Sequence, residues 1–109
     1  MRVLKNLTRA IEDENSKRLY CYRVVSGNKL GVQAYGIEVE RIDTEGNEVI
    51  NVERDCVECI SPHPHKVYEL LNILYNNAVS PIHLIDIIGE YVDECVSDFD
   101  ESYECLATN

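Results

Sequence analysis

Residues 81–96 read PIHLIDIIGEYVDECV, and this stretch decides which fold the chain can adopt. Ser80 is a good N-cap and Pro81 suits the first helical position, so a helix is predicted to begin here. At about 100° per residue, the polar side chains gather in one wedge of the helix. They are His83, Asp86, Glu90, Asp93 and Glu94. Most of the remaining circumference is apolar, so we predict that this helix packs against both a sheet and the preceding helix.

A second amphipathic helix precedes this one. Ser61-Pro62 and Pro64 break the preceding segment and favour a helix start. The apolar residues that follow recur at helical spacing, and Asn76-Asn77 ends the pattern. The stripe consists of Val67, Leu70, Leu71, Leu74 and Ala78. We therefore predict an αα-hairpin with helices at about 63–78 and 81–96.

The first sixty residues show strand patterns instead. Strands are predicted at about 3–12, 18–26, 30–42 and 48–59, separated by polar turns at 13–16, 26–28 and 44–47. In Ile37-Glu38-Val39-Glu40 the apolar side chains face one way and the carboxylates the other. Three short turns in a row predict a four-stranded antiparallel β-meander with one wet face. The fold class is therefore α+β, with the C-terminal αα-hairpin packed on one sheet face.

The chain length of 109 residues fits a single domain. We place that domain at residues 1–97 and predict that residues 98–109, DFDESYECLATN, form an acidic, flexible tail. Five cysteines at irregular spacing, together with an N-terminus that lacks a continuous apolar segment, favour free thiols and a cytoplasmic location. No stretch approaches the ~18 apolar residues of a membrane span.

The net charge of −10 is concentrated in the second half of the chain. Residues 61–109 contain nine Asp or Glu and a single Lys or Arg, which is Lys66. A nucleic-acid-binding face needs clustered basic residues to replace phosphate counterions, so we expect no nucleic-acid partner. The exposed side chains of the second helix would also be acidic, which argues against a DNA-reading helix-turn-helix.

The candidate metal ligands are Cys56 and Cys59 with His63 and His65. Zinc needs converging thiolate and imidazole ligands, but residues three apart on a strand point to opposite faces. The sequence lacks the glycine-rich nucleotide-binding motifs and the hydrolase nucleophile elbow. We therefore expect no enzyme activity, no catalytic residues, no cofactor and no bound metal, with a metal- or thiol-based sensor at these four residues as the alternative.

Several segments carry a family resemblance. They are YGIEV at 35–39, Ser61-Pro62, Leu70-Leu71, VSPIHLID at 79–86 and EYV at 90–92, of which SPIHLID is the most specific. In these segments the chain resembles a family of small bacterial proteins of unknown function, found mainly in spore-forming Gram-positive bacteria. The resemblance covers about residues 3–93. It implies an intracellular protein with a β-meander followed by two helices, and it assigns no activity and no functional residues.

The leading functional hypothesis is a non-enzymatic protein-interaction or regulatory module that uses an acidic surface. That surface is either the sheet face that carries Glu38 and Glu40 or the polar wedge of the second helix. The partner is an unidentified protein, and the open edge of the meander also offers a surface for a homodimer.

Overall fold

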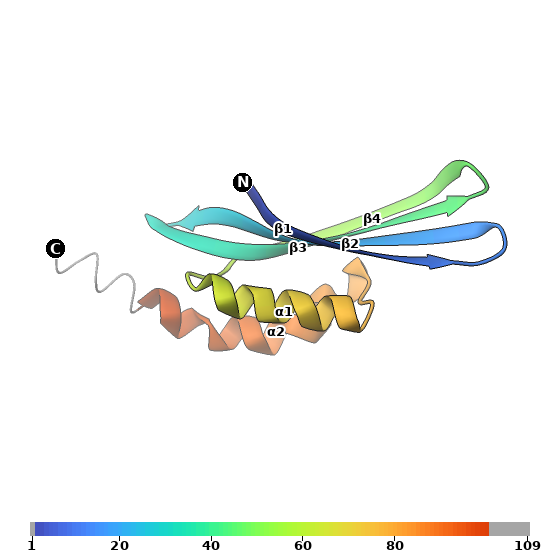
Figure 1. Ribbon diagram of the computed structural model, residues 1–109. Coiled ribbons are helices and arrows are strands. Elements are labelled where there is room, and N and C mark those ends of the chain that lie inside the picture. The colour runs from blue at the N-terminus through green and yellow to red at the C-terminus, as the bar shows by residue number, and fades with distance from the viewer. Residues whose placement is uncertain (1, 101–109) are drawn as a thin grey trace.

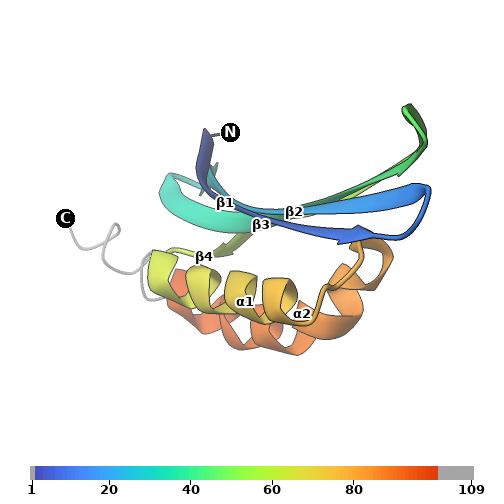
Figure 2. The same ribbon diagram turned by 45° about the vertical axis from the view of Figure 1, so that its right-hand side comes forward.

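The computed structural model describes residues 2–100, and this part of the chain has the predicted α+β architecture. A four-stranded antiparallel sheet with strand order β1-β2-β3-β4 lies against a layer of helices. Figures 1 and 2 show the helices on one face of the sheet only. The elements are β1 (Arg2–Glu12), β2 (Ser16–Lys29), β3 (Val32–Glu45), β4 (Glu48–Ser61), α1 (Pro64–Asn76), the 3-10 turn η1 (Pro81–His83) and α2 (Leu84–Glu94).

The alternation predicted for the third strand is confirmed. Ile37 and Val39 are fully buried in the core, whereas Glu38 and Glu40 lie on the other face. Val24 and Tyr22 stand opposite Ile37 and Val39 in the β2–β3 register, so the same face of both strands is apolar. This face packs against the helices and forms the centre of the core.

The second turn lies four residues later than predicted. β2 continues to Lys29, and the chain reverses at Leu30 and Gly31, whose φ angles are 49° and 87°. Two central residues with positive φ are the requirement of the tight turn that matches the twist of a hairpin. The Asn28 side chain accepts a hydrogen bond of 2.9 Å from the Gly31 N–H. Tertiary pairing along β2 and β3 thus overrides the turn signal of residues 26–28.

The sheet is much longer than the helical layer. β2, β3 and β4 each contain 14 residues, which corresponds to roughly 45 Å, while the 13 residues of α1 span about 20 Å. The turns of the β1–β2 and β3–β4 hairpins therefore project beyond the helices (Figure 1). This accounts for the exposure of Ile11, Val49 and Ile50 near these turns.

α1, and not the helix that follows it, is the central element of the core. It buries Val67, Leu70, Leu71 and Leu74 and contacts all four strands. α2 contacts β4 and α1 and buries only Leu84 and Ile88. The prediction that this helix packs against both the sheet and the preceding helix is confirmed, but much of the apolar surface expected to be buried stays exposed. Four strands about 4.8 Å apart make a sheet only ~14 Å wide, which a single helix of about 10 Å nearly covers.

The C-terminal boundary of the fold also differs from the prediction. Residues 96–100 are helical, so Asp98 to Asp100 do not begin a flexible tail. Phe99 is only 3% exposed and packs against Val32 and Ala34 of β3. Asp98 pairs with Lys66 of α1 at 2.6 Å. Residues 101–109, the remainder of the predicted tail, lie outside the described residues.

Candidate protein-binding surface

The predicted polar wedge lies on the outer side of η1 and α2, and every member is exposed to solvent. We call Asp86, Glu90, Asp93 and Glu94 the acidic ridge, and His83 precedes it. The fully buried Leu84 and Ile88 lie on the opposite side of the helix. His83 Nδ1 and Asp86 Oδ2 are 3.7 Å apart. Since α2 contains no Lys or Arg, the ridge presents only negative charge along this helix.

Apolar side chains are exposed on both flanks of the acidic ridge. Ile87 and Tyr91, which are 42% and 43% exposed, lie one helical turn apart on the flank that faces α1. Ile82, Ile85 and Val96 lie on the other flank, and Ile82 is 69% exposed. Large apolar side chains that remain exposed next to charged groups mark interaction surfaces more often than isolated ones do. Sequence reasoning assigned these residues to the core and therefore missed them as surface residues.

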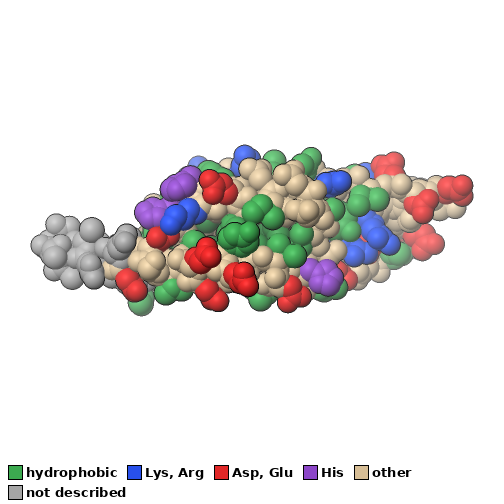
Figure 3. Space-filling view, turned by 90° about the horizontal axis from the view of Figure 1, so that it is seen from below, with side chains coloured by type: hydrophobic (Ala, Val, Ile, Leu, Met, Phe, Trp, Pro, Cys, Tyr) green, Lys and Arg blue, Asp and Glu red, His purple; other side chains and the backbone are tan. Residues whose placement is uncertain are grey.

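A groove runs between α1 and α2 on the side away from the sheet. One part of it, of about 230 Å³, has walls from both helices. Its lining residues are Lys66, Glu69, Leu70, Ile73, Tyr91, Glu94 and Cys95. A second hollow, of about 450 Å³, lies at the linker that joins the two helices and is lined by Asn77, Ala78, Val79, Ser80, His83 and Ile87. We call the two together the interhelical groove, and Figure 3 shows hydrophobic side chains along the middle of this face with carboxylates beside them.

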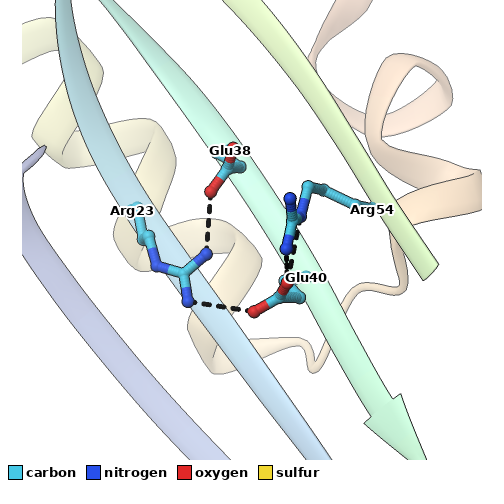
Figure 4. Close-up of polar contacts among 4 residues, drawn as sticks. All are labelled: Arg23, Glu38, Glu40 and Arg54. Carbon is cyan, nitrogen blue, oxygen red and sulfur yellow. Dashed lines mark hydrogen bonds and ion pairs between the residues drawn. The ribbon is translucent and has the colours of Figure 1, made fainter. Parts of the chain in front are cut away.

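The carboxylates of the exposed sheet face are already paired with arginines. Arg23 donates to Glu38 at 2.7 Å and to Glu40 at 3.0 Å, and Arg54 donates to the other oxygen of Glu40 (Figure 4). The Glu40 side chain is only 8% exposed. The hydrogen bonds from Arg54 lower the pKa of Glu40 against the opposing effect of burial, and Arg23 adds to the lowering. These charges are neutralised within the sheet, so this face offers less free negative charge than the acidic ridge.

The four candidate sensor residues do not form a ligand set. Within residues 2–100, no group of three or more His, Cys, Asp or Glu is placed to hold a metal ion. Cys59 lies in an irregular part of β4 with φ of 26°, and the ring centroids of His63 and His65 are 5.9 Å apart with the rings tilted by 34°. Burial, with Glu38 and Glu58 nearby, raises the pKa of Cys56 to about 11. A thiol with a raised pKa is a poor nucleophile and a poor redox sensor.

The ion pair between Lys66 and Asp98 was missed by the sequence analysis. Lys66 is the only Lys or Arg after residue 60, and it lines the interhelical groove. Its ammonium group lowers the pKa of Asp98 chiefly by hydrogen bonding to that carboxylate. The only signal in the sequence was that Lys66 is a single basic residue in the acidic second half of the chain. Its partner, Asp98, could be identified only from the fold.

A family model described as "Family of unknown function (DUF6514)" matches residues 1–94, which shows that the chain belongs to this family. The match extends over the sheet, α1 and the whole of α2. No curated protein and no solved structure matches the chain. In the part of the chain that the structure describes, no helix has the length and apolar character needed to cross a membrane.

Proposed function

We propose that this member of the DUF6514 family is a non-enzymatic protein-interaction module that binds its partner through the outer face of α2. The observation that carries the proposal is the acidic ridge with exposed apolar side chains on both flanks. A surface of this kind can bury apolar area while its charges select and orient a partner of opposite charge.

The contrast between the two candidate surfaces supports the choice of α2. On the sheet face, Glu38 and Glu40 are satisfied by Arg23 and Arg54. On α2, the carboxylates Glu90, Asp93 and Glu94 are exposed, and α2 itself offers them no cation. Like charges four residues apart on a helix, as in Asp86 and Glu90 or Glu90 and Glu94, repel each other, so a basic partner gains an attraction and also relieves this repulsion. We also propose a regulatory role in the cytoplasm and, from the sequence resemblance, an origin in spore-forming Gram-positive bacteria.

The proposal is tested by affinity capture from a native lysate of the organism that encodes the chain. The bait is either the wild-type protein or a triple variant with Asp86→Lys, Glu90→Lys and Asp93→Lys. A matched control reverses the same number of charges at the exposed hairpin residues Glu14, Glu45 and Glu48.

We expect a protein that the wild type and the hairpin control retain and that the ridge variant loses. All three baits should show the same far-UV circular dichroism and melting temperature, because every changed side chain is exposed. If the ridge variant retains everything that the wild type retains, the acidic ridge is only a solvated helix face and the proposal is wrong.

A further inference from the structure

The interhelical groove has the shape of a site for a third helix. Its walls are two neighbouring helices, and the residues that line it recur at helical spacing on each. On α2 the lining residues Ile87 and Tyr91 are four apart, with Cys95 directly after the helix four residues further on. On α1 the lining residues Lys66, Leu70 and Ile73 are four and three apart. Such rows form the ridges and grooves into which the side chains of another helix pack. α1 has 13 residues, so the groove accommodates a helix of about three to four turns.

The chemistry of the groove is apolar at its floor and acidic at its rim. Leu70, Ile73 and Tyr91 provide apolar lining, while Glu69 of α1 and Glu94 of α2 line the same hollow from the two helices. The one cation of the lining, Lys66, is bound to Asp98 at 2.6 Å. A ligand in this groove therefore meets apolar surface at the bottom and carboxylates on both sides.

We propose that the interhelical groove binds an amphipathic helix with basic flanks, supplied by another protein. Its apolar face would cover Ile73, Ile87 and Tyr91, and its Lys or Arg side chains would reach Glu69 on one side and Glu94 on the other. This is the helix-in-groove mode of recognition, in which apolar anchors at i, i+3, i+4 and i+7 enter the groove. The inference rests on the proposed function, because it names the class of partner and extends the binding surface from α2 to α1.

Charge complementarity favours a basic helix from another protein over two other occupants, which are the chain's own residues 101–109 and a second copy of the chain. The chain's own residues 101–109 contain two Glu and no Lys or Arg, so they lack the charge that the rim selects. A second copy related by twofold symmetry would bring the same acidic face against this one. Since residues 61–109 have one basic residue against nine acidic ones, like charges would oppose each other across such an interface.

The test uses the full chain and a designed probe peptide, Ac-LKKLLKLLKKLLKL-NH2, which forms an amphipathic helix with a basic polar face. Two control peptides are used, one with every Lys replaced by Glu and one with the same composition scrambled so that it has no apolar face. Binding is followed by two-dimensional ¹H–¹⁵N NMR, which maps the shifted amides onto the structure.

We expect the basic amphipathic peptide to shift amides around Ile73, Ile87 and Tyr91 and to leave the β3–β4 hairpin unchanged. Reversing Glu69 and Glu94 together to Lys should weaken binding about tenfold or more, which corresponds to ~1.4 kcal/mol. Ile87→Ser should weaken binding similarly, whereas Ile50→Ser, a matched change at an exposed hairpin residue, should not.

Three results would overturn the inference. They are an absence of binding by the basic amphipathic peptide, equal binding of the scrambled peptide, and shifts confined to the sheet face. The affinity capture from lysate distinguishes a failure of the groove inference from a failure of the proposed function. One informative result is a natural partner that is lost when Asp86, Glu90 and Asp93 are reversed but is retained by the variants Glu69→Lys and Ile87→Ser. This result would support the proposed interaction function and exclude the groove as the binding site.

Discussion

Gly36 of β3 is the position where a single methyl group should damage the fold most. It faces an irregular stretch of β4, where the β3–β4 register shifts between Tyr35 and Ile37. A Cβ atom built on Gly36 would lie in contact with the Val57 carbonyl oxygen and 2.7 Å from the carbonyl oxygen of Glu58. These are backbone atoms, so they cannot rotate away as the end of a side chain can. Gly36→Ala therefore forces β3 and β4 apart.

The expected cost follows from the steric conflict. Extra atoms in a packed site cost typically about 1–3 kcal/mol, and we expect ~3 kcal/mol here because the backbone itself must move. For a domain of this size, 1 kcal/mol lowers the melting temperature by roughly 4–8 °C, so Gly36→Ala should lower it by roughly 12–24 °C. Differential scanning calorimetry and urea denaturation measure both quantities.

Two other glycines provide matched controls for this prediction. At Gly27 the nearest atom to an added Cβ is Cys59 Sγ at 3.5 Å, which is an ordinary contact. At Gly89 in α2 the nearest atom is 3.9 Å away, and Ala is the better helix former by about 1 kcal/mol. Gly27→Ala should be nearly neutral and Gly89→Ala stabilising. A Gly36→Ala protein that melts within roughly 3 °C of the wild type would refute the reasoning about the β3–β4 pairing.

Three further predictions concern the turn, the charge network and the thiol. Leu30→Asn should raise the free energy of unfolding by about 1 kcal/mol, measured by urea denaturation, because Leu30 has φ of 49° and Asn tolerates this conformation better. Glu40→Gln should destabilise the protein at pH 7, and the difference in unfolding free energy from the wild type should shrink as the pH falls below 4.5. Arg54 and Arg23 lower the folded-state pKa of Glu40, so its contribution is present above the unfolded-state value and is lost as the pH falls through the folded-state pKa. Cys56 should react slowly with iodoacetamide at pH 8, measured by peptide mass mapping, since a pKa of about 11 in place of 9.0 leaves roughly 100-fold less thiolate.

Each of these has a contradicting outcome. A loss of stability in Leu30→Asn would mean that the Leu30 side chain contributes contacts that its 82% exposure does not suggest. If the difference in unfolding free energy between Glu40→Gln and the wild type stays constant from neutral to acidic pH, the lowered pKa of Glu40 does not contribute to stability. Alkylation of Cys56 at the same rate in folded and urea-unfolded protein would show that burial does not protect this thiol.

Much of the fold was predictable because local pattern and tertiary structure agree. The period-two alternation around Ile37 to Glu40 and the helical stripe from Val67 to Leu74 each have one apolar face, and each buries that face. The turn at Leu30 and Gly31 was misplaced because Gly27 and Asn28 carry a stronger local turn signal. Pairing across the full length of β2 and β3 outweighs that signal.

The candidate surface was only partly predictable. The members of the acidic ridge follow from helical periodicity, since Asp86, Glu90 and Asp93 share one side of any helix built on this sequence. The apolar flanks and the groove do not follow from it. An apolar side chain such as Ile87 or Tyr91 is expected in a core, and periodicity cannot tell whether another element covers it.

The sequence by itself determined the four strands, the two helices, the acidic character of the second half and the polar side of α2. Each is a local property, because alternation, capping and charge are set by residues close together in the chain. Only the tertiary structure decided that α1 occupies the centre of the sheet, that Arg23 and Arg54 neutralise Glu40, and that α2 keeps apolar flanks exposed. The physical reason is the width of four strands, which one helix nearly fills, so that α2 packs beside α1 and part of its apolar surface remains in water.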